Sequence, residues 1–214
     1  MNLQLYFAPG ACSFVPHVGL ETAGAAFEPK IVKFHKGEHR TPEYLALNPN
    51  GQVPVLVVDG KPLTQIVAIC DLIDRRFPDA SLLPKDEWAR IEALSQLAWM
   101  NSAPHTTATR FFFPERYAET EGARTEVKKR AVEEYRGYLE RVQSTIANAM
   151  PYWFGSRVSF HDAYAFTLLR WGGFAGIDPR SFPDYRAYAE RVMQAPPVAA
   201  AAARERISLD TYKG

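Results

Sequence analysis

The segment LQLYFAPGACSFVPHVGLETAG, residues 3–24, decides the fold because it passes from strand to helix across one turn. Apolar side chains stand at every second position of residues 3–7, which is typical of a short strand, and Pro9-Gly10 ends that strand. The apolar residues that follow suit one side of a helix, for which Gly24 is a natural stop. The chain therefore opens with a strand and then a helix.

Three more strands are expected in the first third of the chain. They are the apolar run at residues 31–34, the run at residues 53–58 and the short returning segment at residues 62–64. Thr41 followed by Pro42 is typical of the start of a short helix between the first two runs. Four strands with helices on their faces form a small mixed sheet.

Beyond these strands the apolar spacing is helical. Thr64 is expected to cap a helix that Pro78 ends, and a last helix at residues 185–193 is expected to stop before Pro196, with an alanine-rich turn behind it. We therefore expect an α/β domain of βαβ-ββα order followed by an all-α domain. The expected boundaries are residues 1–78 for the first domain, 79–85 for a linker and 86–214 for the helical domain.

The composition is that of an ordinary globular protein. The 214 residues are 47% hydrophobic and 23% charged, which argues against a disordered chain, and a net charge of +1 offers no basic excess for nucleic acid. The uncharged opening before Glu21 has no basic n-region and is broken by prolines, so we expect neither an export signal nor a membrane span. Two cysteines make neither a disulfide scaffold nor a metal cluster, and we expect both thiols to face a reducing cytoplasm.

Cys12 lies after the first strand, at the start of the first helix. Unpaired N–H groups and the positive end of the helix dipole converge there, which stabilises a thiolate and lowers a cysteine pKa. A lone cysteine is more often a small core residue without chemistry, but the strand, turn, cysteine, helix context favours a nucleophile. Cys70 stands among isoleucines on a helix face, and we interpret it as core.

Two further features are expected to form a ligand pocket together with Cys12. Val53-Pro54 at the start of a strand is either a cis peptide, which frees the Val53 backbone for an extended ligand, or a simple edge-strand proline. Ile66 lies at the start of another helix, where its N–H is a donor for a carboxylate. Together these features describe a pocket for a short thiol peptide that carries a carboxylate.

Three longer segments carry a more specific signal. They are LYFAPGACS at residues 5–13, NPNGQVPVL at residues 48–56 and VSFHDAYAFTLLRW at residues 158–171, the last with Ser159 and Asp162 at capping-box spacing. In this order they resemble the cytosolic glutathione transferases, and most of all the bacterial beta class, which uses a cysteine. The resemblance covers nearly the whole chain. It implies a thioredoxin-like first domain that binds glutathione, a helical second domain, and a homodimer.

The resemblance also implies roles for single residues. Cys12 contacts the sulfur of glutathione or forms a mixed disulfide with it, with Tyr6 and Ser13 nearby. His105 matches the family's histidine that faces the thiol, where an imidazole holds a thiolate or moves a proton near neutral pH. Without the resemblance, a lone histidine next to a proline is more often structural. His161 is expected to be a partly exposed residue of a first helical turn.

The sequence departs from the family pattern near the expected glutathione site. The resemblance places glutathione along Val53 and Pro54, with its γ-glutamyl group at Gln65 and Ile66, where beta-class relatives usually have an acid followed by Gly or Ser. Gln65 accepts from an ammonium without a full charge, and the bulk of Ile66 is expected to crowd the carboxylate. Thr106 stands where a basic residue commonly follows the histidine. Weak affinity for glutathione, or a different cosubstrate, is expected from these departures.

Two hypotheses of different class follow. The first is an enzyme that transfers glutathione to a small hydrophobic electrophile, with Ser13 and His105 orienting the thiol, or that exchanges disulfides through Cys12. The second is a non-catalytic member of the same fold that binds a ligand or partner protein, which Gln65-Ile66 favours. A dithiol oxidoreductase is disfavoured because no second cysteine stands within three positions of Cys12. Neither hypothesis involves a metal, a membrane or nucleic acid.

Overall fold

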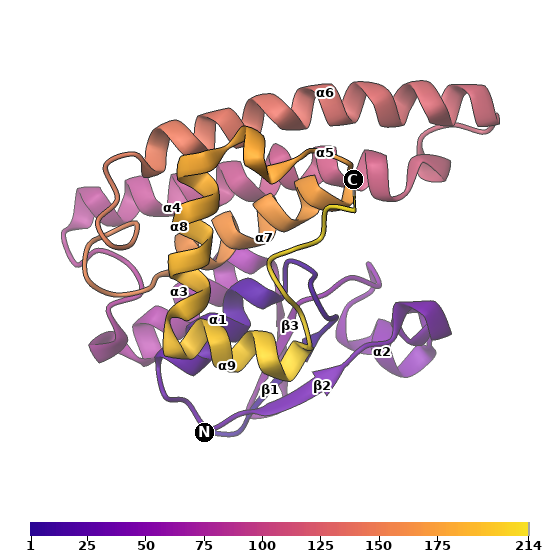
Figure 1. Cartoon of the computed structure of the whole chain (residues 1–214). Helices are drawn as coiled ribbons and strands as arrows, with labels where there is room; N and C mark the ends of the chain where they lie inside the picture. The colour runs from indigo at the N-terminus through magenta and orange to yellow at the C-terminus, as the bar shows by residue number, and fades with distance from the viewer. Residues whose placement is uncertain (214) are drawn as a thin grey trace.

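The computed structural model describes residues 1–213 and consists of a part with a β-sheet and a helical part (Figure 1). The strands are β1 (Leu3–Phe7), β2 (Glu28–Ile31), β3 (Val55–Val58) and β4 (Lys61–Thr64), in the order β2-β1-β3-β4. The β1–β2 pair is parallel, whereas β1–β3 and β3–β4 are antiparallel. The expected small mixed sheet of four strands is confirmed.

Helices cover both faces of this sheet. On one face, Leu5 and Phe7 point into the main core, to which the first and third helices of this part contribute. On the other face, Tyr44 of the second helix packs against Val55 of β3. The alternation of side chains along β1 separates these two faces. The helices of this part are α1 (Phe14–Thr22), α2 (Pro42–Leu47) and α3 (Ile66–Arg76).

Strand β2 does not coincide with the apolar run at residues 31–34. The parallel pairing with β1 extends from Glu28 to Ile31, so the strand comes earlier in the sequence. Phe34 falls in the following 3-10 turn η1 (Phe34–Lys36) and is exposed. The expectation was wrong because pairing with β1, not local hydrophobicity, determines which residues of an edge segment join the sheet.

Helix α3 begins one residue later than expected. Thr64 still pairs with Val55 in the β3–β4 ladder, so Gln65 and not Thr64 is the N-cap. Gln65 has φ +73°, a left-handed backbone conformation that is uncommon for a residue with a side chain. This sharp change of direction joins strand β4 directly to helix α3.

The helical part surrounds a central helix that is buried along almost its whole length. Ser159 and Asp162 form the expected capping box at the start of that helix. His161, in its first turn, is fully buried and not partly exposed, because α7 enters the core at its first turn. The helices of this part are α4 (Glu87–Ser102), α5 (Pro104–Phe112), α6 (Glu121–Ile146), α7 (Phe160–Phe174), α8 (Pro183–Gln194) and α9 (Pro196–Glu205).

Pro196 begins a helix where a turn was expected. Helix α8 ends at Gln194, as the sequence suggested, but Pro196 and Pro197 occupy the first positions of α9. A proline is tolerated there because the first N–H groups of a helix have no intrahelical partner. The alanine-rich stretch is therefore helical, and α9 returns to pack on α1 of the sheet part (Figure 1).

The two parts share one continuous core. Leu82 and Leu83, in the segment expected to be a linker, are buried in that core. Arg90 of α4 forms ion pairs with Asp71 and Asp74 of α3, which ties the parts together at the surface. None of the helices within residues 1–213 has the length and apolar character that a membrane span requires.

Candidate active site

A cleft of about 1170 Å³ lies where the sheet part meets the helical part. The sheet part supplies one wall through the turn before α1, the turn before β3 and the start of α3, and α5 and α7 supply the other. Six of the eight residues predicted for the site line this cleft: Cys12, Val53, Pro54, Gln65, Ile66 and His105.

Cys12 is buried in the turn just before α1. Its Sγ donates to the carbonyl oxygen of Val53 at 3.5 Å. Burial raises the pKa of the Cys12 thiol to about 12, although the N–H groups of Cys12 and Ser13 act in the opposite direction. The expectation of a lowered pKa is therefore wrong. The converging N–H groups are present, but desolvation outweighs them, and Cys12 is a neutral thiol at pH 7.

Tyr6 and Ser13 do not reach the cleft. The Ser13 side chain is fully buried, and its hydroxyl donates to the Ala8 carbonyl at 3.3 Å and accepts from the Ala8 N–H at 3.2 Å. Tyr6 points to the other face of the sheet, where its ring centroid lies 5.9 Å from that of Tyr44. Ser13 therefore shapes the turn that carries Cys12, and Tyr6 belongs to the packing beneath the sheet.

Two side chains of the helical part form hydrogen bonds with the turn before Cys12. The Gly10 N–H donates to Glu205 Oε2 at 2.8 Å, and Trp171 Nε1 donates to the Gly10 carbonyl at 3.0 Å. The other oxygen of Glu205 lies 2.7 Å from Nδ1 of the buried His17 on α1. Sequence reasoning missed these bonds of Glu205 and Trp171 to Gly10, because no local spacing links residue 10 with residues more than 160 positions away.

The Val53-Pro54 peptide is cis, as the first of the two interpretations expected, and the pairing of the Val53 backbone with an extended ligand stays a prediction. Gln65 is exposed in the cleft wall, and no side chain caps the N–H groups of the first turn of α3. The Ile66 side chain is buried in the main core. Most of its bulk is therefore directed into the protein, and the crowding of a ligand carboxylate at the start of α3 stays a prediction.

His105 faces the cleft from the first turn of α5. Its Nδ1 lies 3.2 Å from Asn101 Oδ1 and 2.9 Å from the Tyr164 hydroxyl, and its ring centroid lies 4.9 Å from that of Trp171. Burial lowers the pKa of His105 to about 4, so the ring is neutral at pH 7. A neutral ring carries one N–H donor and one acceptor nitrogen, and the expected titration near neutral pH is wrong.

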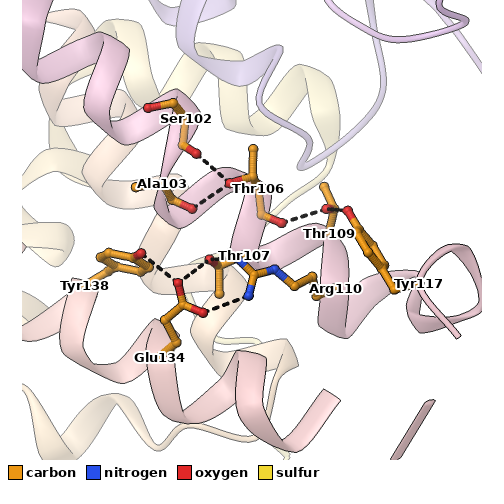
Figure 2. A network of polar contacts seen from close by, with 9 residues as sticks. All are labelled: Ser102, Ala103, Thr106, Thr107, Thr109, Arg110, Tyr117, Glu134 and Tyr138. Carbon is orange, nitrogen blue, oxygen red and sulfur yellow. Dashed lines mark hydrogen bonds and ion pairs between the residues drawn. The ribbon is translucent and has the colours of Figure 1, made fainter. Parts of the chain in front are cut away.

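Figure 2 shows why Thr106 does not replace the missing basic residue. Its hydroxyl donates toward the backbone carbonyls of Ser102 and Ala103, at 2.6 and 3.0 Å. Thr109 likewise donates to the Thr106 carbonyl at 2.7 Å, and Tyr117 therefore donates to Thr109 at 2.5 Å. Both threonines line the cleft. Their protons are already used, so toward a ligand they offer only acceptors.

The part of the chain that the structure describes holds no group of three or more His, Cys, Asp or Glu side chains placed to bind a metal ion. The polar groups of the cleft are a thiol, a neutral imidazole, amides, uncapped helix N–H groups and several basic side chains. Such a set suits an organic ligand with carboxylates and a thiol.

Comparison with known proteins assigns the family. The N-terminal domain model of the glutathione S-transferases matches residues 1–75, and their C-terminal domain model matches residues 100–196. The glutathione S-transferase GstA of Escherichia coli O157:H7 is 31% identical over 203 residues, which cover 92% of this chain and 95% of that protein. The chain belongs to the glutathione S-transferase family.

Solved structures agree with this assignment. A glutathione transferase homologue from Sulfitobacter with bound glutathione superposes with a TM-score of 0.88 at 27% identity, over 96% of this chain and 99% of that one. A bacterial beta-class glutathione S-transferase from Sphingomonas chungbukensis gives a TM-score of 0.82 at 32% identity, over 94% and 98%. The expected two-part fold and the resemblance to the bacterial beta class are confirmed.

Proposed function

We propose that this protein is a glutathione transferase that holds glutathione in the cleft, with its thiol beside Cys12, and joins it to a hydrophobic electrophile bound against the helical part. One observation carries the proposal. Cys12, the Val53-Pro54 peptide and the uncapped start of α3 lie in the walls of one cleft, opposite an aromatic wall. A thiol peptide contacts all three features: its sulfur lies beside Cys12, its backbone lies along Val53-Pro54, and the end with a carboxylate and an ammonium lies at the start of α3.

The start of α3 supports the γ-glutamyl end of this assignment. Its first-turn N–H groups have no side-chain cap, and a carboxylate is favoured at such a helix end. Gln65 stands there with its side chain exposed in the cleft and its backbone at φ +73°. A non-glycine residue held in this conformation costs about 1 kcal/mol, and such strain is retained where a binding site needs a group in a fixed position.

The high pKa of Cys12 defines its role in the transfer. As a neutral thiol, Cys12 has one proton, which in the structure is donated to the Val53 carbonyl. When glutathione binds, the Cys12 S–H turns from Val53 to the glutathione sulfur, which favours the thiolate of glutathione over its thiol. That thiolate attacks the electrophilic carbon and forms the C–S bond, while the leaving group departs with its bonding electron pair and the thiol proton passes to water. His105 orients the bound thiol as a neutral ring and carries no charge.

Thiol–disulfide exchange is the slower activity in this proposal. The attacking species is a thiolate, and a pKa of about 12 leaves roughly one Cys12 in 100,000 ionised at pH 7. Exchange through Cys12 therefore increases with pH, whereas conjugation depends on the thiolate of glutathione. Ser13 supports both activities by shaping the turn that carries Cys12.

Calorimetric titration with glutathione tests the proposal, together with conjugation and disulfide-exchange rates. We expect the wild type to bind glutathione and Cys12→Ser to lose disulfide exchange. Cys70→Ala is the matched control because Cys70 is the other free cysteine and is buried in the core away from the cleft. Absence of glutathione binding at millimolar ligand would overturn the enzyme assignment and favour a non-catalytic binding protein. Disulfide exchange that persists in Cys12→Ser would remove Cys12 from that activity.

We also propose that the protein is a cytoplasmic homodimer. Trp88 and Ile91 are large exposed apolar residues three positions apart on α4, and such neighbours on a helix surface suit a partner subunit. Sedimentation of the wild type and of Trp88→Glu measures the assembly, with a monomer mass of 24.1 kDa as reference. A wild type that sediments as a monomer contradicts the dimer, and cell fractionation of the expressed chain tests the location.

A further inference from the structure

The wall of the cleft that the helical part supplies is aromatic. The ring centroid of Phe112 lies 6.0 Å from that of Trp171 and 6.3 Å from that of Phe174, and all three residues line the cleft. Phe112 and Phe174 are 36% and 54% exposed, although both are large apolar side chains. Uncovered rings inside a cleft accept a planar apolar group.

Arg116 stands at the edge of this aromatic wall. The carbon at the centre of its guanidinium lies 4.2 Å from the ring centroid of Phe113. Arg116 ends the 3-10 turn η4 (Pro114–Arg116), which follows α5 directly. The bond between Tyr117 and Thr109 ties the end of this turn back to α5 (Figure 2). The backbone that carries Arg116 is therefore held beside the cleft.

A second arginine reaches the same region from the sheet part. The Arg40 guanidinium packs beside Gly51, where an added Cβ would lie 3.2 Å from Arg40 Nη1. Burial lowers the pKa of the neighbouring His39, and the charges of Arg40 and Arg116 lower it further. Arg40, His39 and Arg116 all line the cleft. Basic side chains from the two parts of the molecule therefore converge there.

These basic groups are not neutralised by the protein. Among residues 1–213, no carboxylate lies within 4.0 Å of the basic side chains of four lining residues: Lys33, Arg40, Arg116 and Arg206. The one carboxylate of the lining, Glu205, already bonds Gly10 and His17. The chain as a whole carries a net charge of only +1, so this excess is local. Glutathione brings two carboxylates and one ammonium, and part of the excess remains.

We propose that the second substrate of this cleft is a planar apolar electrophile that carries an anionic group, and that Arg116 binds this group while the aromatic wall holds the ring. The inference rests on the proposed glutathione transferase function. Arg40 lies beside the turn that leads to Val53, on the side where glutathione is placed. Arg116 instead follows α5 and stacks on Phe113, whose ring centroid lies 6.3 Å from that of Phe112 in the aromatic wall, on the side assigned to the electrophile.

Two matched ligands test this assignment by equilibrium binding, without turnover. One is the glutathione conjugate of 4-chloro-3,5-dinitrobenzoate, and the other is the conjugate of its neutral methyl ester. Calorimetry measures both, and free glutathione, on the wild type, Arg116→Gln and Arg116→Lys. Arg130→Gln is the control because Arg130 is an exposed arginine of α6 outside the cleft.

The wild type is expected to bind the acid conjugate more tightly than the ester. Arg116→Gln is expected to weaken the acid conjugate by about tenfold, the size of a lost charge-assisted hydrogen bond, and to leave the ester and glutathione within about twofold. Arg116→Lys restores part of the preference and Arg130→Gln changes nothing. An equal loss for all three ligands would assign Arg116 to the glutathione site and overturn the inference, as would an unchanged acid preference. A wild type that binds no glutathione overturns the proposed function as well.

Discussion

At the scale of single residues, the sequence indicates where Cys12 lies but not how readily its thiol ionises. Its place at the start of a helix is visible in the sequence, and the N–H groups that stabilise a thiolate are present. The sulfur is covered by the turn before β3, where the Val53 carbonyl oxygen lies 3.5 Å from Cys12 Sγ. Local spacing therefore predicted that Cys12 stands at the start of a helix and predicted its ionisation wrongly.

The reactivity of Cys12 with iodoacetamide follows from this burial. Because only the thiolate reacts and the pKa of Cys12 lies at about 12, the alkylation rate is expected to rise about tenfold per pH unit between pH 7 and pH 9. Mass spectrometry of the modified peptide measures the rate, and Cys12→Ser reports the background from Cys70. A rate that levels off below pH 8 would instead indicate the low pKa that the helix start alone suggests.

At the scale of elements, the turn that leads into α1 depends on two residues that follow it by more than 150 positions. Glu205 of α9 and Trp171 of α7 bond the N–H and the carbonyl of Gly10, two residues before Cys12. Glu205 also raises the pKa of Cys12 through its negative charge, after the larger effect of burial. Helix α9 therefore affects both where the thiol lies and how readily it ionises.

The substitution Glu205→Gln removes the negative charge of this side chain and keeps its shape. We expect a loss of about 1–3 kcal/mol in the free energy of unfolding, since bonds to a buried charged acceptor are replaced by weaker ones, and faster alkylation of Cys12 at fixed pH. Glu190→Gln, on the exposed side of α8, is the control and should change stability by less than about 0.5 kcal/mol. Slower alkylation in Glu205→Gln would contradict the role of its charge.

Element boundaries were predictable where local chemistry decides them. The turn at Pro9-Gly10, the stop of α1 near Gly24, the Thr41 cap of α2 and the capping box at Ser159 all occur as expected. Boundaries set by pairing were missed, as in β2. The helix at Pro196 was missed because a proline ends one helix or starts another, and only packing against α1 distinguishes the two.

At the scale of the whole molecule, two buried histidines link stability to pH. Burial lowers the pKa of His105 to about 4 and that of His161 to about 3, below the value near 6.5 of an exposed histidine. Below pH 6.5 the unfolded chain therefore binds protons that the folded chain does not. The stability that depends on these neutral rings is complete above pH 6.5 and decreases as the pH falls toward 4.

Urea unfolding between pH 7 and pH 4 measures this dependence. The free energy of unfolding is expected to fall by about 3 kcal/mol from His105 alone, with a further loss from His161. His105→Gln should remove the first contribution and flatten the profile, whereas His35→Gln, at an exposed position, should leave it unchanged. A profile equally steep in His105→Gln would show that other groups cause the acid sensitivity.

The sequence by itself determined the order of strands and helices in the sheet part, the family, and six residues that line the cleft, because strand alternation, helix spacing and turn chemistry act between near neighbours. The tertiary structure decided the charge state of Cys12 and His105, the inward direction of Ile66, and the bracing of Gly10 by Glu205. It also placed Arg116 and Arg40, from different parts of the chain, in the lining of one cleft. These properties depend on burial and on contacts between distant segments, and both arise only when the two parts of the chain pack together.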